Sequence, residues 1–380
     1  MSERIYLDHN ATSPLREGVR EAVLAALEMC GNPSSVHEEG RAARGLIEAA
    51  REKIARLVGV RAEDVIFTSG GTEANALALA PQRGDWACYM SGIEHPSVLA
   101  GGRFGHDSII PLAVTADGVI DLDKLATALA NPQMKGRRPF VSVMAANNET
   151  GAIQPVAEAS SIVHEAGGLL HSDAVQAAGK VPIDLASSGA DMISLSAHKL
   201  GGPKGVGALV LREGITVEPL IKGGGQETRR RAGTENVSGI AGFGVAAELA
   251  LAELSRAVEI GKLRNELEAR ATAIAPDLVV FSANVSRLPN TSAMAVPGTK
   301  AETLLIGLDL AGVAVSSGSA CSSGKVEASH VLKAMGVAPE LAQGALRVSL
   351  GRDTTKAHID RFIAVWGEMI ARLKRGRRAA

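Results

Sequence analysis

The residues with the clearest chemical potential lie where short apolar runs give way to glycine-rich turns. One such run, Met192 to Leu195, alternates as a strand does and leads into the segment Ser196–Lys199 and a glycine-rich turn. Burial at a strand end disfavours the ammonium form of a lysine, and a neutral lysine can attack a carbonyl to form a Schiff base. Taken alone, however, this stretch is better explained by a surface lysine that opens a turn.

Two other segments change that interpretation. The strand-like segment Gly168 to Asp173 ends in an acid, and enough chain for a crossover and another strand separates it from Lys199. Pyridoxal phosphate requires such a pair, because the acid keeps the pyridine nitrogen protonated and the lysine carries the cofactor as an imine. A third segment, Asp64 to Leu77, places Gly70-Gly71-Thr72 between a strand and a helix, where free N–H groups favour a phosphate. Together the three segments predict a pyridoxal phosphate site.

Across nearly its whole length, the chain resembles the cysteine desulfurases of the nitrogen-fixation and iron–sulfur-cluster type. These are fold-type I pyridoxal phosphate enzymes of the class V aminotransferase family. The resemblance begins at Tyr6-Leu7-Asp8-His9-Asn10-Ala11-Thr12 and ends at the segment Ala345–Arg352. Its most specific parts are SLSAHKLGGPKGVGAL, GGGQETRRRAGTENV and SSGSACSSGKVEASHVL. The chain departs from the family at Ser13, where a second threonine is common, and at Ala76, where an asparagine is usual.

The resemblance implies roles that the sequence alone leaves open. Lys199 would bind the cofactor and remove the substrate α-proton, and Asp173 would polarise the ring. The Cys321 thiolate would take the sulfur of L-cysteine as a persulfide and leave alanine. His95, by itself an ordinary loop histidine, would stack on the ring and move protons. The remaining implied cofactor contacts are Gly71, Thr72, Asn148, Gln176, Ser196, His198 and, reaching a neighbouring subunit's phosphate, Thr234.

Two residues are expected to bind the substrate, and one cysteine to move. Asn148 lies in a segment that could be only a turn, and Arg347 by itself could be a salt-bridged surface arginine. The family match assigns both to the substrate, because a guanidinium grips a carboxylate at two points. The serines and glycines around Cys321 cannot pack into a core and predict a mobile loop. No metal is required, although Cys321 could transiently ligate a cluster; Cys30 and Cys88 are expected to be small buried hydrophobes.

Length and composition bound the architecture. The chain has 380 residues, of which 46% are hydrophobic and 21% charged, so two domains with apolar cores are expected. Alternating strands and helices predict an α/β fold with a mostly parallel sheet covered by helices, in which ligands bind at the carboxyl ends of strands. We expect a large cofactor-binding domain over residues 15–255. Residues 1–14 and 256–380 would form a smaller α+β domain that carries the cysteine loop.

Helix boundaries follow from the apolar spacing. Residues 41–58 carry apolar side chains on one face and end at Gly59, and a second stripe runs from Ile359 to Leu373. Both patterns are typical of helices that pack against a core, so neither stripe is expected to form a functional site.

Charge and cysteine usage limit the expected partners. The net charge is −1, which argues against nucleic acid and membrane-surface partners. The sequence has no apolar run of membrane-spanning length and no signal-peptide core, which argues against a membrane partner as well. Three cysteines without Cys-x-x-Cys spacing argue against disulfides and zinc and favour a reducing cytoplasm. The partners implied by the resemblance are L-cysteine, a second copy of the chain in a homodimer, and an iron–sulfur scaffold or other sulfur-acceptor protein.

Two alternatives stay open. One is another reaction of the same fold, such as selenocysteine lyase activity or transamination. The other is a catalytically silent binding or scaffold protein. Transamination needs no nucleophile such as Cys321, and the presence of Lys199, Asp173 and Cys321 together argues against a silent protein.

Overall fold

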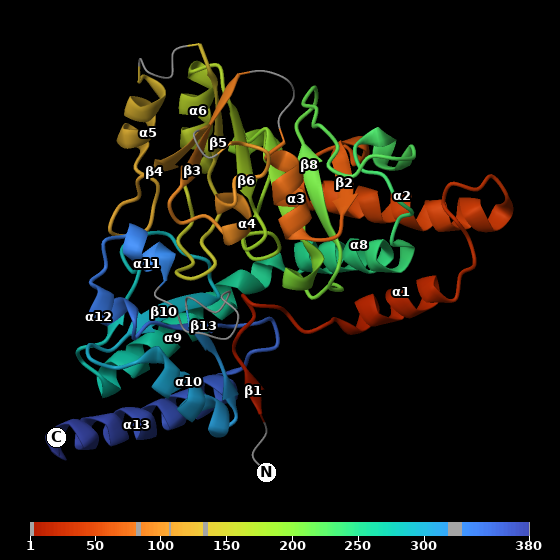
Figure 1. Cartoon of the computed structure of the whole chain (residues 1–380). Helices are drawn as coiled ribbons and strands as arrows, with labels where there is room; N and C mark the ends of the chain where they lie inside the picture. Colours follow the sequence, from red (N-terminus) through yellow and green to blue (C-terminus); the bar gives the residue numbers. More distant parts are fainter. Residues whose placement is uncertain (1–3, 81–84, 106–107, 132–135, 318–328, 380) are drawn as a thin grey trace.

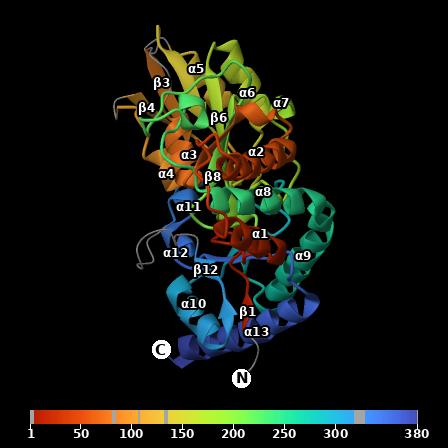
Figure 2. The ribbon, with the colours of Figure 1, turned by 90° about the vertical axis from the view of Figure 1, so that its right-hand side faces the viewer.

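A seven-stranded sheet, a four-stranded sheet and the helices that pack on them organise the computed structural model, with a third sheet of only two strands (Figure 1). It describes residues 4–80, 85–105, 108–131, 136–317 and 329–379. In the turned view, the smaller sheet and the long C-terminal helix lie below the larger sheet (Figure 2). The first described strand, which is near the N-terminus, lies at the same end as the C-terminal helix.

The larger sheet has seven strands in the order β2-β8-β7-β6-β5-β3-β4. All neighbouring pairs are parallel except the two that involve β8, which runs antiparallel to both β7 and β2. The predicted mostly parallel α/β sheet is therefore confirmed. The strands are β2 (Val65–Thr68), β3 (Trp86–Ser91), β4 (Ile109–Leu112), β5 (Arg138–Ser142), β6 (Leu169–Asp173), β7 (Met192–Ser196) and β8 (Gly207–Leu211).

Helices cover both faces of this sheet because its strands are apolar on both sides. On one face, Val65, Phe67 and Ile193 contribute to a core with α2 and α8, and on the other, Ile66 and Met192 contribute to a core with α3. The helices before and around the sheet are α1 (Glu17–Leu27), α2 (Glu38–Val58), α3 (Gly71–Ala78), α4 (Pro96–Leu99), α5 (Leu122–Leu129), α6 (Val156–Glu165), α7 (Leu185–Ser188) and α8 (Val237–Ala252).

Helix α2 shows how the sequence sets an element. Ile47, Ile54 and Val58 recur on one face and are buried, and Gly59 ends the helix with φ of 69°. The helix begins three residues earlier than the apolar pattern predicts, since the ring of His37 accepts a hydrogen bond from the amide of Gly40 and caps the first turn.

The smaller sheet is antiparallel, with strand order β12-β13-β10-β9. Its core includes Ile359, Phe362 and Trp366, so the predicted apolar stripe of the last helix does pack inward. The division of the chain into domains at residues 15 and 256 stays a prediction. The elements here are α9 (Ala257–Ile274), β9 (Val279–Val280), β10 (Thr291–Ala295), α10 (Ala301–Leu310), β12 (Ser316–Ser317), α11 (His330–Ala334), α12 (Pro339–Ala342), β13 (Leu346–Ser349) and α13 (Lys356–Ala379).

The N-terminal segment joins the smaller sheet to the larger one. Strand β1 (Ile5–Tyr6) pairs in parallel with β11 (Val313–Ala314), and Asp8 bridges to Ser349. The chain then reaches the turn that follows β7, where the amide of Ser13 donates to the carbonyl of His198. Residues 8–13 therefore lie between the two sheets.

Within the described part of the chain, no single helix is both long and apolar enough to cross a membrane. Only the segments Val237–Ala252 and Leu254–Ile274 taken together, with a 53° bend between them, have the necessary length and composition.

Candidate active site

A cavity of about 190 Å³ opens where several strands of the larger sheet end. It brings together nine of the residues predicted to hold the cofactor, although they come from segments far apart in the chain. These are Gly71, Thr72, His95, Asn148, Asp173, Gln176, Ser196, His198 and Lys199.

The sheet itself positions the two central residues. Asp173 is the last residue of β6, and Lys199 ends the short 3-10 turn that directly follows β7. Because β6 and β7 are adjacent and parallel, with Asp173 opposite Ser194, the acid and the lysine emerge at the same edge. This is the arrangement that the sequence predicts, with an acid for the pyridine nitrogen of the cofactor and a lysine for its imine.

The phosphate end of the cavity lies at the beginning of α3. Gly71 and Thr72 are its first residues, and their free amides face a space also lined by Ser196 and His198. A Cβ on Gly71 would lie 2.9 Å from Cγ2 of Val175 and 3.4 Å from Cβ of Ser196. Only glycine leaves this cradle open, so the residues present fit an anionic group.

Two hydrogen bonds hold the Asp173 carboxylate. Oδ1 accepts from the amide of Val175 at 2.9 Å, and Oδ2 accepts from Nδ2 of Asn75 at 2.7 Å. Asn75 lines the cavity and is buried, but the sequence did not single it out. Its spacing could have predicted it, because Asn75 follows Thr72 by three residues and both side chains therefore lie on one face of α3.

His95 caps the short helix α4 with its own ring. Nδ1 accepts from the amide of Ser97 at 3.1 Å, so the neutral ring carries its proton on Nε2. Desolvation lowers the pKa of His95, and the nearby Lys199 lowers it further, while Asp173 opposes both effects. His95 is therefore set to be neutral at pH 7 and to accept a proton only when its surroundings change.

The Lys199 ammonium rests on the N-terminal segment. Nζ donates to the carbonyl of Asn10 at 2.5 Å and to that of Ala11 at 2.8 Å. The carbonyl of Asn10 also accepts from Nε2 of Gln176 at 3.0 Å. A second lysine, Lys180, donates to Oε1 of Gln176 and to Oδ1 of Asn10, both at 2.9 Å. Asn10 and Lys180 thus orient Lys199 and Gln176. The sequence analysis did not predict a role for either Asn10 or Lys180.

Arg347 lies beside the cavity and is buried, not at the surface. Its Nη2 donates to Oδ1 of Asp8 at 2.8 Å, and its Nη1 donates to the carbonyl of Asn148 at 3.1 Å. Its Nε and Oδ1 of Asn148 are both buried without a partner among the described residues. A buried N–H without a partner is unfavourable, so Nε is the donor of Arg347 that remains to be paired.

A buried acid adjoins this arginine. Glu149 accepts a hydrogen bond from Oγ of Ser329 at 2.5 Å, and Ser329 also caps α11 by accepting from the amide of Leu332. Desolvation raises the pKa of Glu149 to about 7, although the Ser329 hydrogen bond and the charge of Arg347 oppose the rise. Glu149 therefore changes charge near neutral pH next to a predicted substrate residue.

Thr234 does not line the cavity in a single chain. It is exposed and follows a segment in which Glu227, Thr228 and Arg229 all have left-handed backbone angles, with φ of 48°, 56° and 65°. A bidentate ion pair holds this segment, since Arg51 meets both carboxylate oxygens of Glu227 at 2.7 and 2.9 Å. Non-glycine residues with left-handed backbone angles are strained, so the ion pair with Arg51 holds the segment in an unfavourable backbone conformation.

The three cysteines differ. Cys321 lies outside the described residues. Cys88 is buried in β3, where desolvation raises the pKa of its thiol, as expected of an inert hydrophobe. Cys30 was predicted to be buried, and this is wrong: it is exposed, in the segment that follows the end of α1.

The fold and this cavity define a pyridoxal phosphate enzyme of fold type I: an acid and a lysine on adjacent strand ends, and an anion cradle at a helix start. The model of the class-V aminotransferase family matches residues 5–362. The chain belongs to this family, among its cysteine desulfurases. Its cofactor is pyridoxal phosphate.

Individual relatives agree with this placement. A cysteine desulfurase of Cereibacter sphaeroides is 45% identical, over 98% of this chain and 97% of the relative. The structure of a NifS-like protein from Rickettsia africae is 38% identical with a TM-score of 0.89, covering 97% of this chain and 100% of that one. A structure of SspA in complex with cysteine is 29% identical with a TM-score of 0.77, covering 91% and 98% of the two chains.

Proposed function

We propose that this protein is an L-cysteine desulfurase, which removes sulfur from L-cysteine and releases L-alanine. One observation carries the proposal: Asp173, Lys199 and the Gly71–Thr72 cradle meet in one cavity, with a buried arginine that has a free Nε beside it. The relatives named cysteine desulfurase and the SspA complex with cysteine support the choice of substrate.

The chain's own residues divide the work of the first half-reaction. Bound pyridoxal phosphate supplies an electron-withdrawing ring that makes the α-proton of an attached amino acid acidic. Gly71, Thr72, Ser196 and His198 would hold its phosphate. Lys199 would take the α-proton, and Arg347 would bind the substrate carboxylate through its free Nε.

The sulfur leaves in the second half-reaction. The Cys321 thiolate attacks the substrate sulfur, so that a sulfur–sulfur bond forms as the bond between Cβ and sulfur breaks. The electron pair stays with the carbon, which takes up a proton and becomes the methyl group of alanine. The Cys321 persulfide then passes to an acceptor. This role of Cys321 rests on the sequence alone.

Assembly and partners belong to the same proposal. We infer a homodimer in which Thr234 reaches the phosphate of the neighbouring subunit, because Thr234 is exposed and lies outside its own cavity. The acceptor would be an iron–sulfur scaffold or another thiol protein, and the compartment a reducing cytoplasm.

The test is product formation from L-cysteine and a thiol reductant. The wild-type protein should bind a yellow cofactor and release sulfide and alanine in equal amounts. Borohydride reduction followed by peptide mapping should place the cofactor on Lys199, and Lys199→Ala should remove that label. Cys321→Ala should keep the cofactor but form no persulfide. A keto acid in place of alanine would favour transamination, and a persulfide on Cys30 or Cys88 would refute the role of Cys321.

A further inference from the structure

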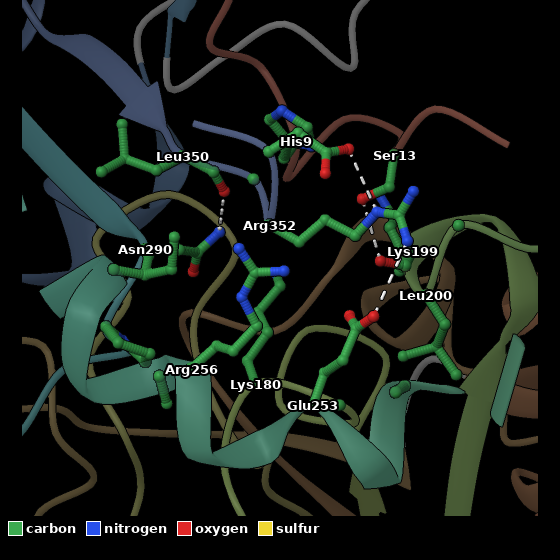
Figure 3. Close-up of a pocket in the computed structure, with 18 of the residues that line it drawn as sticks. His9, Ser13, Lys180, Lys199, Leu200, Glu253, Arg256, Asn290, Leu350 and Arg352 are labelled. Atoms are coloured by element: carbon green, nitrogen blue, oxygen red, sulfur yellow. Dashed lines mark hydrogen bonds and ion pairs between the residues drawn. The ribbon is translucent and has the colours of Figure 1, made fainter. Parts of the chain in front are cut away.

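A second cavity, of about 100 Å³, shares Lys199 with the cofactor cavity (Figure 3). Six parts of the chain enclose it: the N-terminal segment near His9, the turn at Lys180, the turn at Lys199, the junction of α8 and α9, the segment at Asn290, and the segment after β13. Its charged lining residues, besides Lys199, are Arg16, Lys180, Glu253, Arg256, Arg352 and Asp353.

The positive charges in this cavity outnumber the negative ones. Arg16 meets Glu253 at 2.9 Å, and Arg352 meets Asp353 at 3.1 Å, which accounts for both carboxylates. Arg256 has no hydrogen-bond or ion-pair partner for its guanidinium among the described residues. Apart from Lys199, the positive charges left without a carboxylate are therefore those on Lys180 and Arg256. His9 adds no further positive charge, because desolvation lowers the pKa of its ring to about 4.

Lys180 is the less exposed of the two unbalanced cations. Its ammonium is held only by neutral oxygens, Oδ1 of Asn10 and Oε1 of Gln176. Desolvation lowers its pKa well below the usual value, and the charges of Lys199 and Arg347 lower it further. An anion beside it would favour the charged form and so raise this pKa toward its usual value.

We propose that this second cavity binds a small oxyanion between Lys180 and Arg256. The two side chains extend from separate segments into one space (Figure 3). A space of about 100 Å³ holds a few water molecules, so it suits a sulfate, a phosphate or a short carboxylate. The apolar walls at Leu254 and Leu350 lower the local dielectric and strengthen the attraction.

Occupation of this cavity would reach the cofactor. Lys180 orients Gln176, which lines the cofactor cavity, and Asn10, whose carbonyl accepts from Lys199. An anion that binds the Lys180 ammonium would weaken its hydrogen bonds to Oδ1 of Asn10 and Oε1 of Gln176. The absorption band of the bound cofactor should therefore shift when the oxyanion binds.

Calorimetric titration of the holoenzyme with sodium sulfate, and separately with sodium acetate, at constant ionic strength tests the site. Saturable binding of either salt is expected, and tighter binding of one identifies an inorganic or a carboxylate ligand. Arg256→Gln should weaken binding at least tenfold, as should Lys180→Met. Lys262→Gln, which removes an exposed cation on α9 outside the cavity, should leave it unchanged.

Three outcomes would overturn the proposal: no saturable binding of either salt, binding unchanged by Arg256→Gln, or equal weakening by Lys262→Gln. Binding is measured without turnover. A failed oxyanion site would therefore leave the desulfurase assignment intact, and a failed desulfurase assay would leave the oxyanion site intact.

Discussion

Replacing Glu149 with glutamine should stabilise the protein at alkaline pH and have little effect in acid. Glu149 is buried, and desolvation raises its pKa from 4.5 to about 7. Each pKa unit corresponds to ~1.4 kcal/mol, so keeping this group as a buried carboxylate costs ~3 kcal/mol of unfolding free energy. Glutamine cannot ionise, and its amide oxygen can still accept the hydrogen bond from Ser329.

The sign of the pH dependence follows from which state loses its proton first. Below about pH 4.5, Glu149 is protonated in the folded and unfolded chains, so its ionisation costs nothing. Between about pH 4.5 and 7 the unfolded chain ionises while the folded one stays protonated, so the contribution of Glu149 to stability falls as pH rises. Above about pH 7 the loss is complete.

Urea unfolding of the holoenzyme at pH 5 and pH 8 measures this effect. The advantage of Glu149→Gln over the wild type should be small at pH 5 and approach ~3 kcal/mol at pH 8. Glu158→Gln, at an exposed position on α6, should show no such difference between the two pH values. Parallel stability curves for Glu149→Gln and the wild type would refute the assignment of a raised pKa.

Three further substitutions test other contacts. Arg51→Met leaves Glu227 buried without its partner and should lower the unfolding free energy by ~3–5 kcal/mol; if adding Glu227→Gln recovers none of it in urea unfolding, the ion pair is not the cause. Asn75→Ala removes one of the two hydrogen bonds to Asp173 and should weaken cofactor binding by ~10-fold or more, measured by absorbance titration; unchanged affinity would contradict this. Thr228→Gly relieves a left-handed backbone and should raise the unfolding free energy by ~1 kcal/mol, whereas a loss would show that Thr228 makes a contact of its own.

The parts of the site that could be predicted are those set by local sequence. Thr72, Asp173 and Lys199 each lie at or just after the carboxyl end of a strand, so strand order alone brings them to one edge. Gly71 was predictable for a similar reason, because a glycine before a helix marks a close backbone approach. These assignments needed no knowledge of how distant segments meet.

The residues that sequence reasoning missed depend on distant contacts. Asn10 accepts hydrogen bonds from Lys180, 170 positions away, and from Lys199, 189 positions away. No local sequence pattern around these residues predicts the two contacts. The position of Asn10 follows from β1, which pairs with β11 in the second half of the chain. The burial of Cys30 was predicted from residue type alone and is wrong, since Cys30 lies in an exposed segment after α1.

The strained segment around Glu227 bears on how subunits would associate. Its three left-handed residues and the Arg51 contact are complete within one chain, so the backbone before Thr234 is ordered before any neighbour arrives. A segment that orders itself only on contact loses conformational entropy at that moment, which weakens association. Here the entropy is lost when the subunit folds. In the proposed homodimer, association through this segment should therefore resemble rigid docking, with a rate that depends little on loop rearrangement.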